Sequence, residues 1–269
     1  MFSEGAVVTS TLSTEQLNQY HRDGIVFPVS VLSQEEVLLF RAALESLAGN
    51  CEETALKRFD NLHLFFPWAY RLVTHEHLLN AVAGILGDDI LVDASLVFYK
   101  RPHDPSYVSW HQDSVYTTWH LTPSTSAWIA LTASRPANGC MRVIPGSHKS
   151  GSLHHVNISD PNMLNRRGER IDMVLDESQA IDVLLRPGEM SLHQSTVVHG
   201  SNSNVSEEPR IGFIVRFVTS QTTNPGRPML RVRGAADCSH LDMAQPPRET
   251  DPESALTAWR VFTSAKTRS

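Results

Sequence analysis

Hydrophobic residues in the first third of the chain recur at helical spacing. Capping-box patterns begin at Ser13 and Ser33, each with a glutamine or glutamate three residues later, and an amphipathic stretch follows each of them. The first stretch ends at Gly24, and a third stretch with the same period covers residues 76–86. The pattern therefore predicts three helices. In the second helix, the stripe expected to be buried consists of Val37, Phe40, Leu44 and Leu47.

From residue 90 onward the hydrophobic period changes to two, which indicates strands, and proline-glycine turn signals separate several of them. Helices followed by roughly eight short strands predict a mainly β protein, a barrel or jelly roll with a helical buttress. The polar segments 158–180 and 219–250 look irregular, and long loops of this kind are often lids or binding loops. The predicted strands are residues 90–100, 107–113, 126–133, 140–144, 181–185, 189–193, 195–200 and 210–218.

Composition narrows the class of protein. The chain has 269 residues, with 23 Lys and Arg against 29 Asp and Glu, so its net charge is −6. This balance disfavours nucleic-acid binding as the main activity, because a duplex partner requires a basic face. No apolar run approaches the roughly 18 residues of a membrane-spanning helix, and the N-terminus lacks the basic region of a secretory signal. Three widely spaced cysteines indicate reduced thiols in the cytoplasm. The sequence does not indicate the oligomeric state.

His111 and Asp113 stand two positions apart in the predicted strand 107–113. Side chains at i and i+2 of a strand point to the same face, so an imidazole and a carboxylate would lie side by side. Two histidines and one carboxylate are the usual ligands of non-haem Fe(II) sites that activate oxygen. An isolated His-x-Asp motif is weak, however, and a surface strand with an ion-paired histidine is its commoner explanation.

His199 and Arg210 form a second pair, separated by polar turn residues. An antiparallel hairpin would place them on adjacent strands, where the planar guanidinium could bind a carboxylate. A charge in such an apolar strand is costly unless it is paired, although Arg210 could also mark the solvated start of the strand. His193, in another predicted strand, is an alternative to His199 as a ligand.

Four segments resemble the phytanoyl-CoA dioxygenase family of Fe(II)- and 2-oxoglutarate-dependent oxygenases. The most specific is residues 110–151, which begins WHQDSVYTTWH and ends IPGSHKSG. The others are residues 14–33 (TEQLNQYHRDGIVFPVSVLS), 185–204 (LRPGEMSLHQSTVVHGSNSN) and 209–218 (PRIGFIVRFV). The resemblance implies a double-stranded β-helix, which is a cupin-like jelly roll.

The resemblance also implies a set of site residues. His111, Asp113 and His199 match the iron ligands, and the His-Gly-Ser motif with an arginine eleven residues on favours His199 over His193. Arg210 matches the residue that forms a salt bridge with the distal carboxylate of 2-oxoglutarate. In addition, Ser201 matches a hydroxyl that contacts this carboxylate, and Trp128 matches an aromatic residue of the cosubstrate pocket.

The choice of substrate is less well indicated. Tyr116 and Trp119 follow the first ligand pair directly, and we expect them in the substrate pocket. The aromatic stretch 62–72 is more simply explained by packing between helices and barrel. Basic clusters within 166–170 and 227–233 could bind an anionic group, although a solvated face is the usual explanation of such clusters.

The implied function is oxidation of a small metabolite or natural-product intermediate, most simply hydroxylation, with Fe(II), O2 and 2-oxoglutarate, which is converted to succinate. Desaturation, cyclisation or epimerisation would begin with the same oxidation. A different metal chemistry and a non-catalytic cupin-like binding module are alternatives of another class. We expect a single domain, with helices in about residues 13–87, the β-helix in about 90–220 and a lid or loop region in about 221–269.

Overall fold

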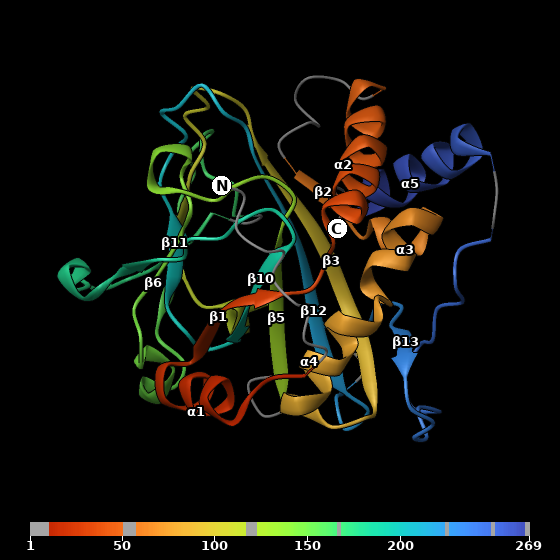
Figure 1. Ribbon diagram of the computed structural model, residues 1–269, viewed down its shortest axis with the longest axis horizontal. Helices are drawn as coiled ribbons and strands as arrows, with labels where there is room; N and C mark the ends of the chain where they lie inside the picture. Colours follow the sequence, from red (N-terminus) through yellow and green to blue (C-terminus); the bar gives the residue numbers. More distant parts are fainter. Residues whose placement is uncertain are drawn as a thin grey trace, which may run out of the picture.

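Two antiparallel sheets face each other in the computed structural model, and helices cover the outer face of the larger sheet (Figure 1). This arrangement confirms the predicted double-stranded β-helix with a helical buttress. The structure describes residues 11–50, 58–116, 123–165, 168–223, 226–248 and 251–266.

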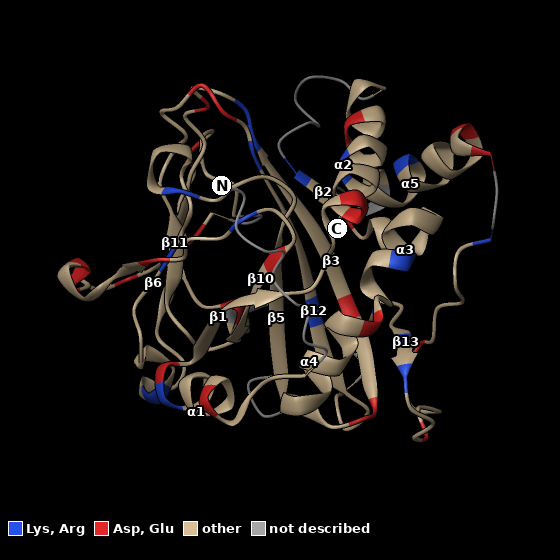
Figure 2. Ribbon diagram, viewed as in Figure 1, with Lys and Arg blue, Asp and Glu red and all other residues tan. Residues whose placement is uncertain are grey.

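The larger sheet has seven strands in the order β1-β10-β5-β12-β3-β13, and β2 also pairs with β3. Its central strands are long and mostly apolar, and β5 carries no charged residue (Figure 2). The strands are β1 (Ile25–Ser30), β2 (Arg58–Asp60), β3 (Ile90–Lys100), β5 (Ser124–Ala130), β10 (Glu189–Gln194), β12 (Arg210–Thr219) and β13 (Leu230–Arg233).

The smaller sheet has four short strands in the order β4-β11-β6-β9, and β7 and β8 form a separate pair. These strands are β4 (Val108–His111), β6 (Met141–Val143), β7 (His155–Asn157), β8 (Glu169–Ile171), β9 (Ile181–Asp182) and β11 (His199–Ser201). Short 3-10 turns lie at η2 (Leu62–Leu64), η3 (Asp113–Tyr116), η4 (Pro136–Asn138), η5 (Ser147–Ser150) and η6 (Glu177–Gln179).

The first two helices begin where their capping signals place them, whereas α3 (Pro67–Val73) was not predicted from the sequence. Ser13 and Ser33 both form complete capping boxes, and Gly24 ends the first helix in the left-handed conformation with φ 79°. The predicted apolar stripe of the second helix is buried. The helices are α1 (Thr14–Asp23), α2 (Gln34–Gly49), α3 (Pro67–Val73), α4 (Glu76–Leu86) and α5 (Pro252–Lys266). None of the described helices is long and apolar enough to cross a bilayer.

Strand β12 separates two hydrophobic cores, because alternate side chains point to opposite faces of a sheet. Phe213 and Phe217 pack toward the helices, in a core that also holds Leu44 of α2. Ile214 points the other way and packs with Trp128 between the two sheets. The face of β12 that carries Ile214 therefore borders the space between the sheets, where a ligand could be enclosed.

Three segments differ from the expectation. The first third of the chain contributes β1 and β2 as well as helices, so the periodic pattern understated its strands. The segments 158–180 and 219–250 contain β8 and β13, whose few residues are too short to show a period. Beyond residue 250, α5 packs against the helical side through Trp259, whose ring lies 5.8 Å from that of Phe59. The division into a single domain stays a prediction.

Candidate metal and cosubstrate site

His111, Asp113 and His199 converge at one end of a cavity between the two sheets. Each offers one ligand atom, and these atoms all lie within 4.8 Å of one another. All three residues are buried. The cavity, of ≈ 110 Å³, is lined by these residues and by Trp128 and Arg210. Two imidazoles and one carboxylate with the rest of the coordination sphere open are the donor set that suits Fe(II), so the residues present fit this metal.

Backbone carbonyl groups fix the tautomer of both histidines. Nδ1 of His111 lies 2.9 Å from the carbonyl oxygen of Ser109, and Nδ1 of His199 lies 3.0 Å from that of Val197. A carbonyl group can only accept, so each Nδ1 carries the proton and donates it. Each Nε2 is therefore left with its lone pair directed into the cavity, as a metal ligand requires.

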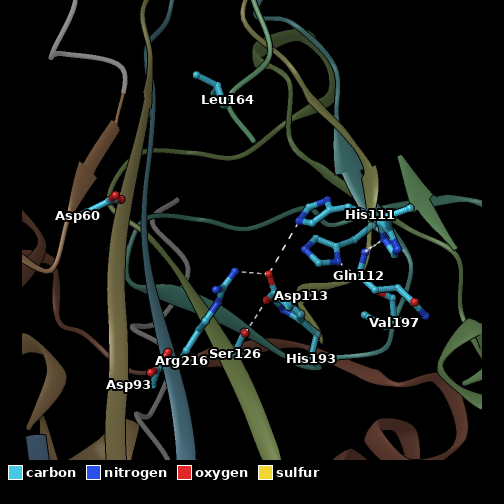
Figure 3. Close-up of polar contacts among 12 residues, drawn as sticks. Asp60, Asp93, His111, Gln112, Asp113, Ser126, Leu164, His193, Val197 and Arg216 are labelled. Atoms are coloured by element: carbon cyan, nitrogen blue, oxygen red, sulfur yellow. Dashed lines mark hydrogen bonds and ion pairs between the residues drawn. The ribbon is translucent and has the colours of Figure 1, made fainter. Parts of the chain in front are cut away.

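The carboxylate of Asp113 is held from two strands of the larger sheet (Figure 3). Ser126 of β5 donates a hydrogen bond of 2.7 Å to Oδ2, and Arg216 of β12 donates to Oδ1. Ser126 and Arg216 are direct partners across the β5/β12 ladder. The register of two strands thus sets the orientation of one carboxylate.

Electrostatics keep these groups in their ligating forms. Burial lowers the pKa of His111 and places that of His199 well below its usual value. Burial would raise the pKa of Asp113, but Arg216 and His193 hold it well below its usual range. At neutral pH the site therefore presents two neutral imidazoles and one carboxylate, which need not lose a proton to bind a metal.

The local structure around His111 and Asp113 corrects the predicted strand 107–113. Strand β4 ends at His111, and Asp113 begins the 3-10 turn η3, so the two side chains are not on one strand face. They are brought together by the turn between them, which Gln112 secures. The Gln112 amide donates to the carbonyl groups of Gly151 and Thr196, and its oxygen accepts from the N–H of Leu153.

His193 is the alternative ligand that the sequence left open, and it lies beside the site. Its Nε2 is 3.5 Å from Asp113 Oδ2, and its ring centroid is 4.8 Å from that of His199. It does not belong to the group whose ligand atoms lie within 4.8 Å of one another. The geometry therefore favours His199 as the ligand and places His193 behind the carboxylate.

Arg210, which is 1% exposed, lines the same cavity six residues along β12 from Arg216, the partner of Asp113, so it lies toward the other end. It donates to the carbonyl oxygen of Gly139, and its buried Nε has no hydrogen-bond partner among the described residues. No carboxylate among the described residues pairs with it. A buried guanidinium is costly unless it meets an anion, so this cavity end fits the distal carboxylate of a bound diacid. Burial lowers its pKa to about 10, which leaves it charged at neutral pH.

Lys100 is a site residue that the sequence analysis missed. It is the cross-strand partner of Arg210, is fully buried, and donates a hydrogen bond of 2.7 Å to Ser201 Oγ. Burial and the nearby Arg210 charge lower its pKa to about 5. Ser201 lines the cavity, and the hydrogen bond to its hydroxyl places Lys100 directly behind it. The charge at the end of the apolar predicted strand 90–100 was the available signal, but its position opposite Arg210 is seen only in the fold.

Trp128 packs against Arg210 across a glycine. The guanidinium carbon of Arg210 lies 5.2 Å from the centroid of the indole ring. Gly212 follows Arg210 by two residues on the same face of β12, and a Cβ atom there would approach the indole to 2.1 Å. The absence of a side chain at this position therefore allows the indole to cover the guanidinium and line the cavity.

The predicted hairpin between His199 and Arg210 is wrong. Strand β11, which carries His199, belongs to the smaller sheet, and β12, which carries Arg210, belongs to the larger one. The polar residues 202–209 cross from one sheet to the other. The two side chains therefore face the same cavity from opposite sheets, which brings them to one ligand by a route that sequence spacing does not show.

The predicted substrate residues lie within or beside residues 117–122, which are outside the described part of the chain. Trp119 and the side chain of Tyr116 lie outside the described residues. The aromatic stretch 62–72 packs into the helical core, where Trp68 contacts Phe213 with ring centroids 6.2 Å apart. Packing is thus the correct explanation for that stretch. Of the basic clusters, Arg227 lines the cavity, where it pairs with the buried Asp93 through two hydrogen bonds.

Comparison with known proteins agrees with this geometry. Residues 20–212 match the family model described as phytanoyl-CoA dioxygenase (PhyH). An ectoine dioxygenase of Bordetella parapertussis is 28% identical over 261 residues, which cover 84% of this chain and 81% of that protein. Phytanoyl-CoA dioxygenase domain-containing protein 1 of Bos taurus is 30% identical over 165 residues, which cover 60% of this chain and 56% of that protein.

Solved structures show the same fold. The non-heme monooxygenase ThoJ in its apo form is 32% identical, with a TM-score of 0.76 over 93% of this chain and 94% of its own. EctD from S. alaskensis with 2-oxoglutarate and 5-hydroxyectoine has a TM-score of 0.63 over 82% of this chain and 80% of its own, at 22% identity. The chain belongs to the phytanoyl-CoA dioxygenase family and is an Fe(II)- and 2-oxoglutarate-dependent oxygenase.

Proposed function

We propose that the cavity between the sheets is the active site, with iron at one end and the distal carboxylate of 2-oxoglutarate at the other. The proposed iron ligands are His111, Asp113 and His199. The proposed cosubstrate residues are Arg210, Ser201, Trp128 and Lys100. The single observation that carries this proposal is the location of both ends in one buried cavity. On its two walls lie a triad of possible metal ligands and a guanidinium that no carboxylate of the described residues pairs with, and these match the two ends of a keto-diacid.

The reaction that fits is hydroxylation. Bound iron, O2 and 2-oxoglutarate together supply an oxidation in which a substrate C–H becomes C–OH while 2-oxoglutarate becomes succinate and carbon dioxide. The protein residues orient the reactants. Arg210 and Ser201 fix one end of the cosubstrate, Asp113 and the two histidines fix the metal, and the apolar wall with Trp128 and Ile214 excludes water from the space between.

The substrate is proposed to be a small polar metabolite or natural-product intermediate. The family name does not decide this, because function depends on the site and not on the fold. Polar side chains line the cavity away from the metal, among them Arg58, Asp60, Asn61 and Asn165. A relative is named for its action on ectoine, which is a small molecule. The prediction that Tyr116 and Trp119 contact the substrate is retained, as is the prediction of a cytoplasmic location.

Succinate formation tests the proposal. Purified protein with Fe(II), ascorbate and 2-oxoglutarate should release succinate, and a suitable substrate from a panel of small metabolites should increase the rate. Absence of succinate while the protein demonstrably binds iron would contradict the proposal.

The Asp113→Ala variant separates an oxygenase from a binding module that keeps the barrel without turnover. An oxygenase should lose nearly all succinate formation, since one of three metal ligands is removed. A binding module should keep its affinity for its small ligand, measured by calorimetry on the same variant. The Asp23→Ala variant, at the end of α1 and outside the cavity lining, is the control for loss of a carboxylate.

A further inference from the structure

Arg216 lies on the wall of the active-site cavity, in contact with a proposed metal ligand. It follows Arg210 by six residues on the same face of β12, and both line the cavity. Its side chain is 13% exposed, and its guanidinium reaches Asp113 (Figure 3). In the sequence, Arg216 is visible as the only charged residue besides Arg210 in the strand β12. No role in binding 2-oxoglutarate accounts for it, since Arg210 occupies the far end of the cavity.

Arg216 and a metal ion would approach the same oxygen of Asp113. Arg216 donates to Oδ1, which is also the oxygen 3.8 Å from Nε2 of His111, on the side of the other metal ligands. The second oxygen, Oδ2, faces Ser126 and His193 instead. Two cations at one carboxylate oxygen repel each other, so metal binding weakens the pairing between Arg216 and Asp113.

The charged groups around the cavity sum to a net positive charge, which an additional anion could neutralise. Among the described residues, four guanidinium groups line it, together with two carboxylates, and a third carboxylate, Asp93, pairs with one of the four. The charge of Fe(II) is cancelled by the two carboxylates of 2-oxoglutarate. One positive charge therefore remains among these groups in the loaded cavity, and protonation of the adjacent Lys100 on 2-oxoglutarate binding would add a second. The four arginines are Arg58, Arg210, Arg216 and Arg227, and the two lining carboxylates are Asp60 and Asp113.

We propose that Arg216 is the anchor for a carboxylate group of the substrate, which it binds once the metal has engaged Asp113. The substrate class is then a small carboxylic acid, and its carboxylate lies beside the metal ligands and not at the mouth of the cavity. Arg227 and Arg58 are less suited to this role. Arg227 makes two hydrogen bonds to Asp93, and Arg58 bonds Asp60 and the carbonyl oxygen of Leu164. This inference rests on the proposed function and names its substrate class.

Metal binding provides the first test, and it requires no turnover. Co(II) is titrated into the metal-free native protein and into Arg216→Gln at about pH 8, where proton competition for the carboxylate is small. Because the variant lacks the cation that competes for Asp113, we expect it to bind Co(II) severalfold more tightly than the native protein. Weaker binding by Arg216→Gln would make Arg216 a positioning residue for Asp113 and would overturn the proposal. Arg71→Gln, an exposed position on α3, controls for loss of one guanidinium.

Substrate-class binding provides the second test. A panel of metabolite carboxylic acids, each matched with its primary amide, is titrated into anaerobic protein loaded with Fe(II) and 2-oxoglutarate. The visible band of the iron–2-oxoglutarate complex serves as the signal. At least one acid should bind more tightly than its amide, and Arg216→Gln should weaken that acid by about tenfold to a hundredfold, with Arg216→Lys in between. A panel in which no acid binds better than its amide, or an acid that binds Arg216→Gln equally well, overturns the proposal.

The two tests distinguish failure of the proposed function from failure of the proposed role of Arg216. A native protein that gives no iron–2-oxoglutarate band contradicts the proposed function itself. A native protein that gives the band, and retains it in Arg216→Gln, upholds the proposed function whatever the outcome for the acids.

Discussion

His199 is the direct partner of His111 across the antiparallel pair of β11 and β4, and their ring centroids lie 4.2 Å apart. On its other side, His199 is paired with Val143 of β6. The distance between two proposed metal ligands is therefore set by strand register, and a shift of one residue would turn His199 out of the cavity. A site built on paired strands is held in place before any metal arrives.

The second oxygen of Asp113 gives a prediction about metal affinity. Removal of the Ser126 hydroxyl in Ser126→Ala leaves Oδ2 without its 2.7 Å hydrogen bond and the carboxylate less firmly oriented. We expect Co(II) affinity to fall by about tenfold, the usual lower range for loss of a partner to a metal ligand. Ser191→Ala is a matched control, because Ser191 is buried on the neighbouring strand β10 with no partner for its hydroxyl. Equal Co(II) affinities in the two variants would contradict the prediction.

Much of this site could be predicted because its motifs are local. The spacing of His111 and Asp113, and the order of His199 and Arg210, are visible in the chain and in its family resemblance. Lys100 could not be found in this way, because its importance comes from pairing with Arg210 across 110 positions of sequence. Arg216 was missed for a similar reason, since only the folded chain brings it to Asp113.

The fold shows the same division between local and long-range information. Helix ends were predictable because Ser13, Ser33 and Gly24 act on neighbouring backbone groups. The assignment of β11 and β12 to different sheets was not, because strand pairing depends on residues far apart in the chain. Strands of two to four residues, such as β2 and β9, are also too short to show any period.

Replacement of Arg210 should affect cosubstrate binding more than chemistry. Arg210→Met keeps much of the side-chain volume but removes the only buried guanidinium at that end of the described cavity. We expect the apparent KM for 2-oxoglutarate to rise by about a hundredfold, which corresponds to loss of a charged hydrogen-bonded pair. Succinate formation against 2-oxoglutarate concentration measures this change. Thermal unfolding supplies an independent readout, since 2-oxoglutarate should raise the Tm of native protein but not that of the variant. An unchanged KM would mean that the carboxylate is anchored elsewhere.

Lys100 predicts that 2-oxoglutarate binding takes up a proton. Its pKa of about 5 leaves it neutral at pH 7 in the free protein, and a carboxylate bound nearby favours the ammonium form. A pKa raised by binding means that the complex holds more protons than the free protein, so affinity should fall as pH rises from about 5 up to the raised pKa of the complex. Calorimetry in buffers of different ionisation enthalpy measures the proton uptake, which we expect to approach one per site and to disappear in Lys100→Met. Proton uptake that persists in this variant would assign it to another group.

The close approach of Gly212 to Trp128 predicts that no side chain is tolerated at position 212. In Gly212→Ala the added Cβ would lie 2.1 Å from the indole of Trp128, so the ring must move away from Arg210 or the two strands must separate. Overpacking of this kind costs about 1–3 kcal/mol of unfolding free energy, and we also expect weaker 2-oxoglutarate binding because the ring no longer lines the pocket in its present position. Gly49→Ala is the control, since a Cβ there has no atom of the described residues within 4 Å, and a helical alanine should be neutral or slightly stabilising. Both variants are compared by chemical denaturation and by 2-oxoglutarate titration. If Gly212→Ala matched Gly49→Ala in both measurements, close contact between β12 and Trp128 would not be needed to form the pocket.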